Sequence, residues 1–319
     1  MITPDFLHYL AVGLAIALGS IGSGIGQGLG AFSTVGALAR QEQGNDQVFR
    51  SMVIGLAFIE SGVILALVIT LMMLFGDTQA ITWGSAIAEI GIAIMIGFAA
   101  TAISIASSYA VKSSATSISR QPIFAQKILT LMLVTQSLME APVVFSFVIG
   151  LIIKAQFSDT MTIYSGIKFL ASTICLALGS IGPCVGQGIF ANSSCNAAGL
   201  NRSAYNKLLP FSIINGAVIQ TPLIFSLLMA ILIIFFNISE VSPVTSVISF
   251  CVSALAIGLG TFGTSTAAGF VGSKSAKQIA LNPDNYSVLF RSNILAQAFI
   301  ESSAIYSLII ALALLTRLR

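Results

Sequence analysis

Residues 57–61 read AFIES, and related segments return as SLMEA at 137–141, AVIQT at 217–221 and AFIES at 298–302. Each segment lies within a long apolar stretch and places one acidic or amide side chain there: Glu60, Glu140, Gln220 and Glu301, at spacings of 80, 80 and 81 residues. A carboxylate in a bilayer-spanning helix costs about 2.5–3.5 kcal/mol even on the mildest insertion scales. Three such carboxylates at a fixed period indicate a function, and ion transport is the usual one.

The composition is that of a membrane protein. The chain has 319 residues, of which 56% are hydrophobic and 8% charged, whereas soluble domains carry about 25% charged residues. A net charge of +3 is too small to indicate a nucleic-acid partner. No positive segment precedes the first apolar run, so we expect no cleavable signal peptide. The sequence predicts an all-α protein with eight transmembrane helices, near 9–36, 54–75, 83–111, 128–153, 165–195, 209–236, 246–272 and 289–315.

Internal repetition divides these helices into pairs. ALGSIGSGIGQG at 17–28 returns as ALGSIGPCVGQG at 177–188, displaced by 160 residues. The same displacement carries Glu60 onto Gln220, and one of 161 carries Glu140 onto Glu301. The chain therefore reads as four helical hairpins, with hairpins 1 and 3 alike and hairpins 2 and 4 more loosely alike. Their predicted boundaries are 1–78, 79–158, 159–239 and 240–319.

The first helix of each hairpin is rich in small residues. Hairpin 1 alone has seven glycines between residues 13 and 30: Gly13, Gly19, Gly22, Gly24, Gly26, Gly28 and Gly30. Small residues allow helix backbones to approach closely in a membrane. We expect a tightly packed inner layer, as in the inner wall of a ring. A nucleotide-binding glycine loop is excluded because the run has neither a preceding strand nor a GK[ST] ending.

These features resemble the c subunit, or proteolipid, of rotary ATP synthases and ATPases, over nearly the whole chain. The family's polar loop is complete in hairpin 2 as Arg120-Gln121-Pro122, and Glu140 follows 18 residues after the proline. Hairpin 1 has Arg40-Gln41-Glu42 with Glu60 at the same distance, and hairpin 4 has Asn282-Pro283 with Glu301. Hairpin 3 keeps the spacing from Arg202 to Gln220 but lacks both motif and carboxylate.

The resemblance implies a two-layered rotor ring of several chains that turns in the bilayer against a static a-type subunit supplying an arginine. It assigns ion carriage to Glu60, Glu140 and Glu301, and contact with the central stalk to the polar loops. The chain would be no enzyme by itself but a membrane-sector subunit without a cofactor. Facing lipid, each carboxyl should be neutral, and a nearby cation should favour its ionised form.

Charge placement predicts the orientation. Ten of the 14 Lys and Arg residues lie near the joins within hairpins, whereas the joins between hairpins carry mainly Asp77, Asp159 and Glu240, with Lys154 as an exception. The positive-inside rule places the basic joins in the cytoplasm. Both termini are then outside, despite Arg317 and Arg319. We expect a bacterial or archaeal cell membrane.

The transported ion is H⁺ or Na⁺, with H⁺ favoured. Sodium-dependent family members use a first-helix glutamine and a hydroxyl after the carboxylate. Hairpin 1 offers Gln27 and Ser61, but hairpin 4 has Ser302 and Tyr306 with Ala268 in place of the glutamine, and hairpin 2 has Ser107 there and Ala141 after its acid. Gln136 and Gln297, one helical turn before Glu140 and Glu301, could each offer another oxygen. The poorest site decides which ion the ring carries.

Four further sets of residues receive structural interpretations. Gln220 cannot titrate, so we expect hairpin 3 to be silent and Gln220 to hydrogen-bond Gln187. Glu89, in the first helix of hairpin 2, is interpreted as structural and near the interface, with an ion-path role as the alternative. His8 is interpreted as a lone interfacial residue rather than a ligand. The cysteines lack metal-ligand or disulfide spacing and are expected to pack between helices: Cys175, Cys184, Cys195 and Cys251.

Two other classes of protein fit less well. A secondary transporter or channel built from repeats would be expected to contain broken helices and a specialised gate, whereas four near-equal hairpins offer no such element. A purely structural proteolipid pore would not need titratable groups in its helices.

Overall fold

The computed structural model describes residues 3–40, 44–76, 81–238 and 242–316, and within those ranges all regular structure is helical. Eight spans are long and apolar enough to cross a membrane, as predicted, although the helices extend beyond most of the expected ends. One of the eight is divided in two at Glu140. The long helices are α1 (Pro4–Leu38), α2 (Asn45–Phe75), α3 (Trp83–Arg120), α4 (Ala125–Met139), α5 (Ala141–Lys154), α6 (Ile163–Leu200), α7 (Tyr205–Phe235), α8 (Pro243–Leu281) and α9 (Tyr286–Thr316).

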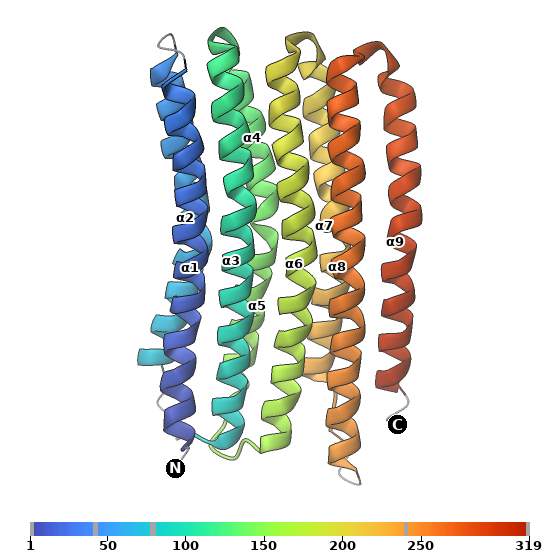
Figure 1. Ribbon diagram of the computed structural model, residues 1–319. Helices are drawn as coiled ribbons and strands as arrows, with labels where there is room; N and C mark the ends of the chain where they lie inside the picture. Colours follow the sequence, from blue (N-terminus) through green and yellow to red (C-terminus); the bar gives the residue numbers. More distant parts are fainter. Residues whose placement is uncertain (1–2, 41–43, 77–80, 239–241, 317–319) are drawn as a thin grey trace.

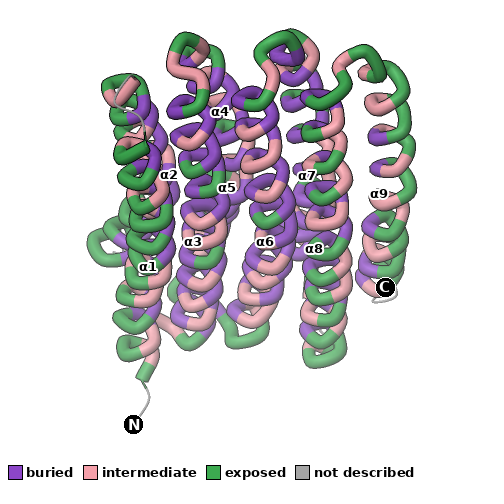
Figure 2. Tube along the Cα trace, turned by 45° about the horizontal axis from the view of Figure 1, so that its top comes forward, coloured by how far each residue is buried: buried purple, intermediate pink, exposed green. Residues whose placement is uncertain are grey.

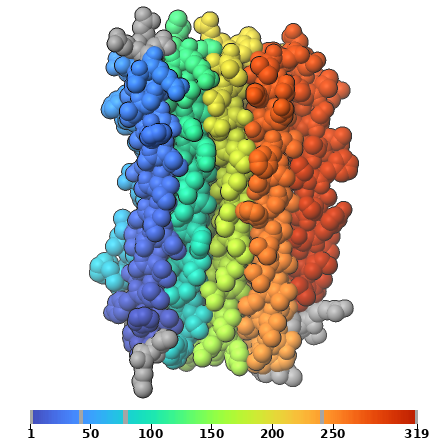
Figure 3. Space-filling model, viewed as in Figure 1, coloured from blue at the N-terminus to red at the C-terminus, as the bar shows by residue number. Residues whose placement is uncertain are grey.

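The helices form two rows (Figure 1). One row consists of the first helix of each hairpin, in the order α1, α3, α6, α8, with each packed on the next. The second row runs α2, α4 with α5, α7, α9, and each of its members also packs on the first helix of its own hairpin. Consecutive hairpins therefore lie side by side in chain order. The space-filling view shows the first row as adjacent columns (Figure 3).

Helix starts repeat from hairpin to hairpin. Thr3, Thr82 and Thr162 each precede a first-row helix, and each hydroxyl accepts a hydrogen bond from the backbone N–H three residues later. Such N-caps satisfy donors that the helix itself leaves unpaired. At the other end of the bundle, short 3₁₀ turns lead into three second-row spans, at Pro122–Phe124, Arg202–Ala204 and Pro283–Asn285. The joins within hairpins thus all lie at one end, with the chain termini at the other (Figure 1).

Small residues bring the first-row helices into backbone contact, as the glycine pattern predicts. A Cβ on Gly26 of α1 would collide with the Ser104 carbonyl of α3. Similarly, a Cβ on Gly186 of α6 would collide with the Ser265 carbonyl of α8. Because van der Waals packing drives helix association in lipid, these close approaches hold the row together.

The two outer hairpins expose more surface than the two central ones. Burial is greatest along α3 and α6, which have first-row neighbours on both sides, and least along α9 (Figure 2). The α1–α2 side and the α8–α9 side are both uncovered edges of the sheet of hairpins. A ring built from this chain would cover each edge with the opposite edge of another copy.

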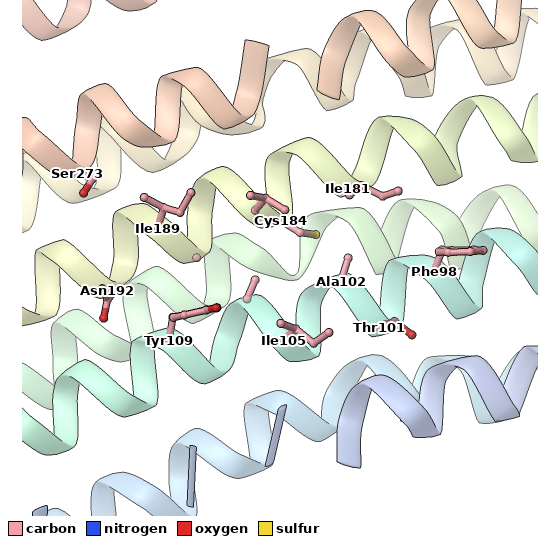
Figure 4. Close-up of a pocket in the computed structure, with 13 residues that line it drawn as sticks. Phe98, Thr101, Ala102, Ile105, Tyr109, Ile181, Cys184, Ile189, Asn192 and Ser273 are labelled. Carbon is pink, nitrogen blue, oxygen red and sulfur yellow. The ribbon is translucent and has the colours of Figure 1, made fainter. Parts of the chain in front are cut away.

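A groove of about 580 Å³ lies between α3 and α6 (Figure 4). Its walls are mostly apolar, for example Phe98, Ile105 and Ile181, with Tyr109 and Asn192 among the polar exceptions. None of the four repeated acidic or amide residues lines it. The groove is therefore not the site at which the carboxylates act.

Candidate ion-binding site

The four repeated positions lie at one level of the bundle, one to each hairpin. Ser61 of α2 contacts Glu140, which follows α4. The Gln220 side chain of α7 in turn donates to the Leu138 carbonyl, and Thr221 of α7 lies beside Glu301 of α9. This series of contacts links positions 60–61, 138–140, 220–221 and 301 across consecutive hairpins. The sequence period therefore corresponds to a common depth in the second row.

Glu140 forms its site with the preceding hairpin rather than within its own. The Ser61 hydroxyl lies 2.8 Å from each Glu140 carboxylate oxygen. The same hydroxyl is also 2.7 Å from the Phe58 carbonyl. In hairpin 1 we expected Ser61 to assist Glu60, the acid before it. The structure corrects this assignment, because successive side chains on a helix point in different directions and that of Ser61 faces hairpin 2.

A break in the second-row span sets the position of Glu140. Helix α4 ends at Met139 and α5 begins at Ala141, with Pro142 in its first turn. Proline has no backbone N–H, so it cannot donate to the carbonyl four residues before it. The carboxylate therefore stands where the hydrogen-bond ladder of the helix is interrupted. Pro142 thus fixes where a half-buried acid meets its neighbour.

Gln136 lies one turn before Glu140 and is fully buried. Its Nε2 donates to the Ser107 hydroxyl at 2.7 Å and to the Gly55 carbonyl at 3.1 Å. Its Oε1 is buried with no hydrogen-bond partner among the described residues. Ser107 occupies the first-row position that Gln27 and Gln187 hold in hairpins 1 and 3. The second-row glutamine thus fills the space that a longer first-row side chain would take.

Glu301 has a related environment between hairpins 3 and 4. The carboxyl is half-buried, Thr221 is its hydroxyl neighbour, and its Oε1 is buried without a hydrogen-bond partner in the described part of the chain. One turn earlier, Gln297 Nε2 donates to Asn215 Oδ1. Asn293 Nδ2 donates to the same oxygen at 2.9 Å. Sequence reasoning missed Asn215, Asn293 and Thr221.

Gln220 has a different partner from the one expected. Its Nε2 donates to the Leu138 carbonyl of hairpin 2 at 3.1 Å. The predicted hydrogen bond to Gln187 is wrong: both amide atoms of Gln187 are buried and unpaired within the described ranges. Ala141 stands at the repeat position that Ser61 holds in hairpin 1, and it offers no side-chain oxygen. Hairpin 3 therefore holds an amide–carbonyl pair where hairpins 2 and 4 hold a carboxyl beside a hydroxyl.

Glu60 and Ser302 lie on the two uncovered edges. Glu60 is exposed and Gln27 half-buried on the edge of hairpin 1. At the edge of hairpin 4, the Ser302 hydroxyl donates to the Phe299 carbonyl at 2.7 Å, which repeats the local geometry of Ser61. Tyr306 is 64% exposed, so its predicted support of Glu301 is not seen. Each edge thus carries half of a junction like that between hairpins 1 and 2.

The polar loops clamp neighbouring hairpins together. Gln121 Nε2 donates to the Gly199 carbonyl at 2.7 Å, and Asn201 Nδ2 donates to the Ala280 carbonyl at 2.9 Å. Gln121 therefore faces the next hairpin as well as the end of the bundle. Residues that remain available at this end include the exposed Arg40, Arg120 and Asn282 and the partly exposed Pro122 and Pro283. Gln41 lies outside the described residues.

Glu89 belongs to a buried ionic cluster away from the repeated level. Its Oε2 lies 2.6 Å from His8 Nδ1 of α1, and its Oε1 lies 3.1 Å from Lys154 Nζ at the end of α5. His8 is buried against Glu89, so it is not the lone residue that was expected. The cluster joins three helices of hairpins 1 and 2 near the end that carries the N-terminus. Its contacts agree with the structural interpretation of Glu89.

The carboxylates are distributed rather than gathered into one centre. In the described part of the chain, no three His, Cys, Asp or Glu side chains lie close enough together to hold a metal ion. Cys175, Cys184 and Cys195 are buried, Cys251 is partly buried, and all four are free thiols. Glu140 and Glu301 instead each lie between two hairpins with a hydroxyl beside them, and Glu60 lies on an uncovered edge. Such a site can hold a proton on the carboxyl or a monovalent cation between the oxygens.

Comparison with known proteins identifies a family that matches three of the four hairpins. The profile of the family described as the c subunit of ATP synthase matches residues 10–73, 90–153 and 251–314, together more than half of the chain. These segments contain Glu60, Glu140 and Glu301, and none contains Gln220. The family match thus falls on the three hairpins that keep the carboxylate.

Individual relatives are the size of one hairpin. The ATP synthase c subunit of Geotalea uraniireducens is 46% identical over 68 residues, which is 21% of this chain and 75% of the relative. The ATP synthase c subunit of Dehalococcoides mccartyi is 41% identical over 71 residues, 22% of this chain and 93% of the relative. The chloroplastic ATP synthase c subunit of Emiliania huxleyi is 46% identical over 71 residues, 22% of this chain and 87% of the relative. With its repeated hairpins and matching profile, the chain belongs to the family of ATP synthase c subunits.

Proposed function

We propose that this protein is an ion-carrying subunit of the rotor ring in a rotary ATP synthase or ATPase, and that Glu60, Glu140 and Glu301 bind and release protons. The observation that carries the proposal is the common level of the repeated positions, with Glu140, Gln220 and Glu301 at junctions between hairpins and Glu60 on an uncovered edge. A carboxyl at such a junction is shielded on one side by the neighbouring hairpin. It can become ionised where a stator supplies water and a positive charge, and neutral again before it meets lipid.

The driving force follows from membrane electrostatics. One elementary charge that crosses 100 mV yields about 2.3 kcal/mol. If each carboxyl takes its proton from one side of the membrane and releases it to the other, this energy biases the ring toward one direction of rotation. The arginine of an a-type stator subunit would separate the two access paths by its charge.

A complete ring requires junctions between copies. Glu60 and Ser302 lie on opposite edges, and Ser302 repeats the backbone contact that Ser61 makes beside Glu140. Placing Ser302 of one copy beside Glu60 of the next would complete the third site. The chains would then close head to tail into a homo-oligomeric ring.

Hairpin 3 occupies a place in the ring without carrying a proton. The Gln220 amide does not titrate, so three of four hairpins are active and each turn moves three quarters of the charge of a fully active ring. Fewer ions per turn require a larger driving force for each ATP made. This stoichiometry favours ATP-driven pumping, although it is compatible with synthesis.

Protons fit the sites better than sodium ions. A hard cation needs several oxygen ligands, whereas a proton needs only the carboxyl. At Glu140 the side-chain oxygen contact is Ser61, and the Gln136 amide nitrogen is held by Ser107 and Gly55. Hairpin 4 has Ala268 at the first-row glutamine position. A sodium site would need Gln136 Oε1 and Gln297 Oε1 to turn toward the acids.

Orientation follows from the basic joins, which we assign to the cytoplasm, with both termini on the outer side. The exposed loop residues at that end, Arg40 and Arg120 among them, would then contact the central stalk. The apolar outer surface of α2, α7 and α9 would face lipid or the stator.

The test is proton pumping by the complete complex in sealed vesicles. ATP addition should acidify the lumen, and a hydrophobic carbodiimide should stop it. A triple variant E60Q/E140Q/E301Q should assemble into rings but not pump, because no titratable group remains at the common level. A triple variant that pumps at the wild-type rate would contradict the proposal.

A further inference from the structure

Two residues of different hairpins meet at the silent junction. Pro142 has no N–H to donate to the Leu138 carbonyl, which would be its partner in an uninterrupted helix. The Gln220 side chain of the next hairpin donates to that same carbonyl at 3.1 Å. The hydrogen bond that the proline removes from its own helix is thus replaced from outside it.

The first junction shows what happens when the proline is absent. Gly62 occupies the position of Pro142 in hairpin 1 and keeps its N–H, so α2 continues through it without a break. Here the Phe58 carbonyl, which corresponds to that of Leu138, lies within the unbroken helix α2, and the one side chain that donates to it is Ser61 of the same helix. The side chain facing it from hairpin 2 is Glu140, a hydrogen-bond acceptor when ionised. At this junction a non-titrating donor faces a carbonyl that lacks its helical partner. Pro222 removes the same partner from the Val218 carbonyl of α7, but that helix continues unbroken.

We propose that Pro142 is a positioning residue for Gln220, and that the pair holds the hairpin 3 junction permanently in the arrangement of a loaded site. The amide is neutral and supplies an N–H to the backbone carbonyl, as a protonated carboxyl would supply an O–H. Hairpin 3 then passes the stator in the same closed form at every point of the cycle. This inference rests on the proposed function, in which position 220 is the non-titrating counterpart of the three acids.

Burial determines how much this hydrogen bond contributes to stability. Gln220 is 8% exposed, and a buried carbonyl or amide without a hydrogen-bond partner is costly. Removing the Gln220 amide should therefore destabilise the ring while Pro142 is present, because the Leu138 carbonyl then has no donor. If residue 142 had an N–H, the helix itself would satisfy that carbonyl and the amide would matter less.

A double-mutant cycle on the assembled ring tests the pairing. The full-length chain is purified as a ring, and the midpoint temperature of ring dissociation in detergent is measured for wild type, Q220L, P142A and P142A/Q220L. We expect Q220L to lower the midpoint, and to lower it by less than half as much in the P142A background. Equal shifts in the two backgrounds would overturn the inference.

A second comparison does not depend on the proline variant folding. Q220N keeps the amide but shortens the side chain, so it should no longer reach the Leu138 carbonyl and should lower the midpoint about as far as Q220L. A Q220N ring as stable as wild type would contradict the pairing. These experiments measure ring stability rather than transport. The Pro142–Gln220 pairing can therefore be refuted while the three acids carry protons, and it can be supported even if the acids do not.

Discussion

The junction between hairpins 1 and 2 and the junction between hairpins 2 and 3 lie at the same level of the bundle but differ in chemistry. At the first, the Ser61 hydroxyl lies 2.8 Å from both oxygens of Glu140. At the second, Gln220 donates to a backbone carbonyl and Ala141 offers no hydroxyl. The comparison teaches that the loss of a carboxylate is accommodated locally. Another donor–acceptor pair joins the two hairpins there, although Gln220 Oε1 is buried without a hydrogen-bond partner in the described part of the chain.

The largest expected effect comes from increasing the number of consecutive ring positions that lack a carboxylate. In a head-to-tail ring the active order is 60, 140, silent, 301, so one silent position already separates Glu140 from Glu301. Either E140Q or E301Q would leave two silent positions in succession. E60Q would leave active and silent positions alternating, with no gap wider than the natural one. We expect E140Q and E301Q to abolish coupled pumping.

E60Q is the matched control for this gap. It should retain coupled pumping while the number of protons per turn falls by one third, measured as the proton-to-ATP ratio in vesicles. If all three single variants lose pumping equally, the spacing of silent positions is not what limits the rotor.

A second prediction concerns a substitution that makes the junction between hairpins 1 and 2 resemble the junction between hairpins 2 and 3. S61A removes the hydroxyl that donates to Glu140, and a hydrogen bond of this kind contributes about 0.5–1.5 kcal/mol. Without this donor the ionised form of Glu140 is less favoured, so more of the carboxyl is protonated and available to carbodiimide. The reaction should be up to about tenfold faster, because 1.36 kcal/mol corresponds to a factor of ten. Peptide mass spectrometry resolves the label on each acid.

The same variant tests which acid Ser61 serves. The labelling rate of Glu60, which precedes Ser61 in the chain, should stay within the experimental error. A change at Glu60 with none at Glu140 would restore the within-hairpin assignment. S303A is the control, since its hydroxyl donates to its own helix at Ile300.

A third prediction concerns the other end of the same junction. E89Q removes the buried carboxylate that lies between His8 and Lys154, and removal of one partner from a buried ion pair costs about 3–5 kcal/mol. The ring should dissociate at a lower temperature, whereas the protons carried per turn should not change. A changed proton-to-ATP ratio in E89Q would place Glu89 in the ion path.

The smallest expected effect is that of sodium. If the sites hold protons, millimolar sodium at high pH should not slow carbodiimide labelling of Glu60, Glu140 or Glu301. Protection by sodium would show that Gln136 and Gln297 turn their oxygens toward the carboxylates, and would identify Na⁺ as the coupling ion.

The sequence predicted the spans well, because long apolar stretches leave a strong signal, and the fixed period of the four polar residues corresponds to their common level in the structure. The close glycine contacts, such as Gly26 against Ser104, followed from composition. Cross-hairpin pairing did not follow, since spacing along one helix does not reveal which neighbour a side chain faces. Ser61 was therefore assigned to Glu60, and Gln220 to Gln187.

Other contacts carried signals that could have been used. Thr221 directly follows Gln220, as Ser61 follows Glu60, so a hydroxyl facing hairpin 4 was there to be noticed. His8 and Glu89 both lie within two turns of the starts of first-row helices, which places them at similar depth. The role of Pro142 required knowing what lies opposite the carbonyl it leaves without a donor.

The measurement that tests the central claim most directly is the count of carbodiimide-reactive residues per chain in the intact ring, taken to completion and read by peptide mass spectrometry. The account predicts three labelled residues, Glu60, Glu140 and Glu301, with Glu89 unlabelled. Labelling of Glu89 in place of these, or failure of any of the three to react after complete treatment, would contradict it.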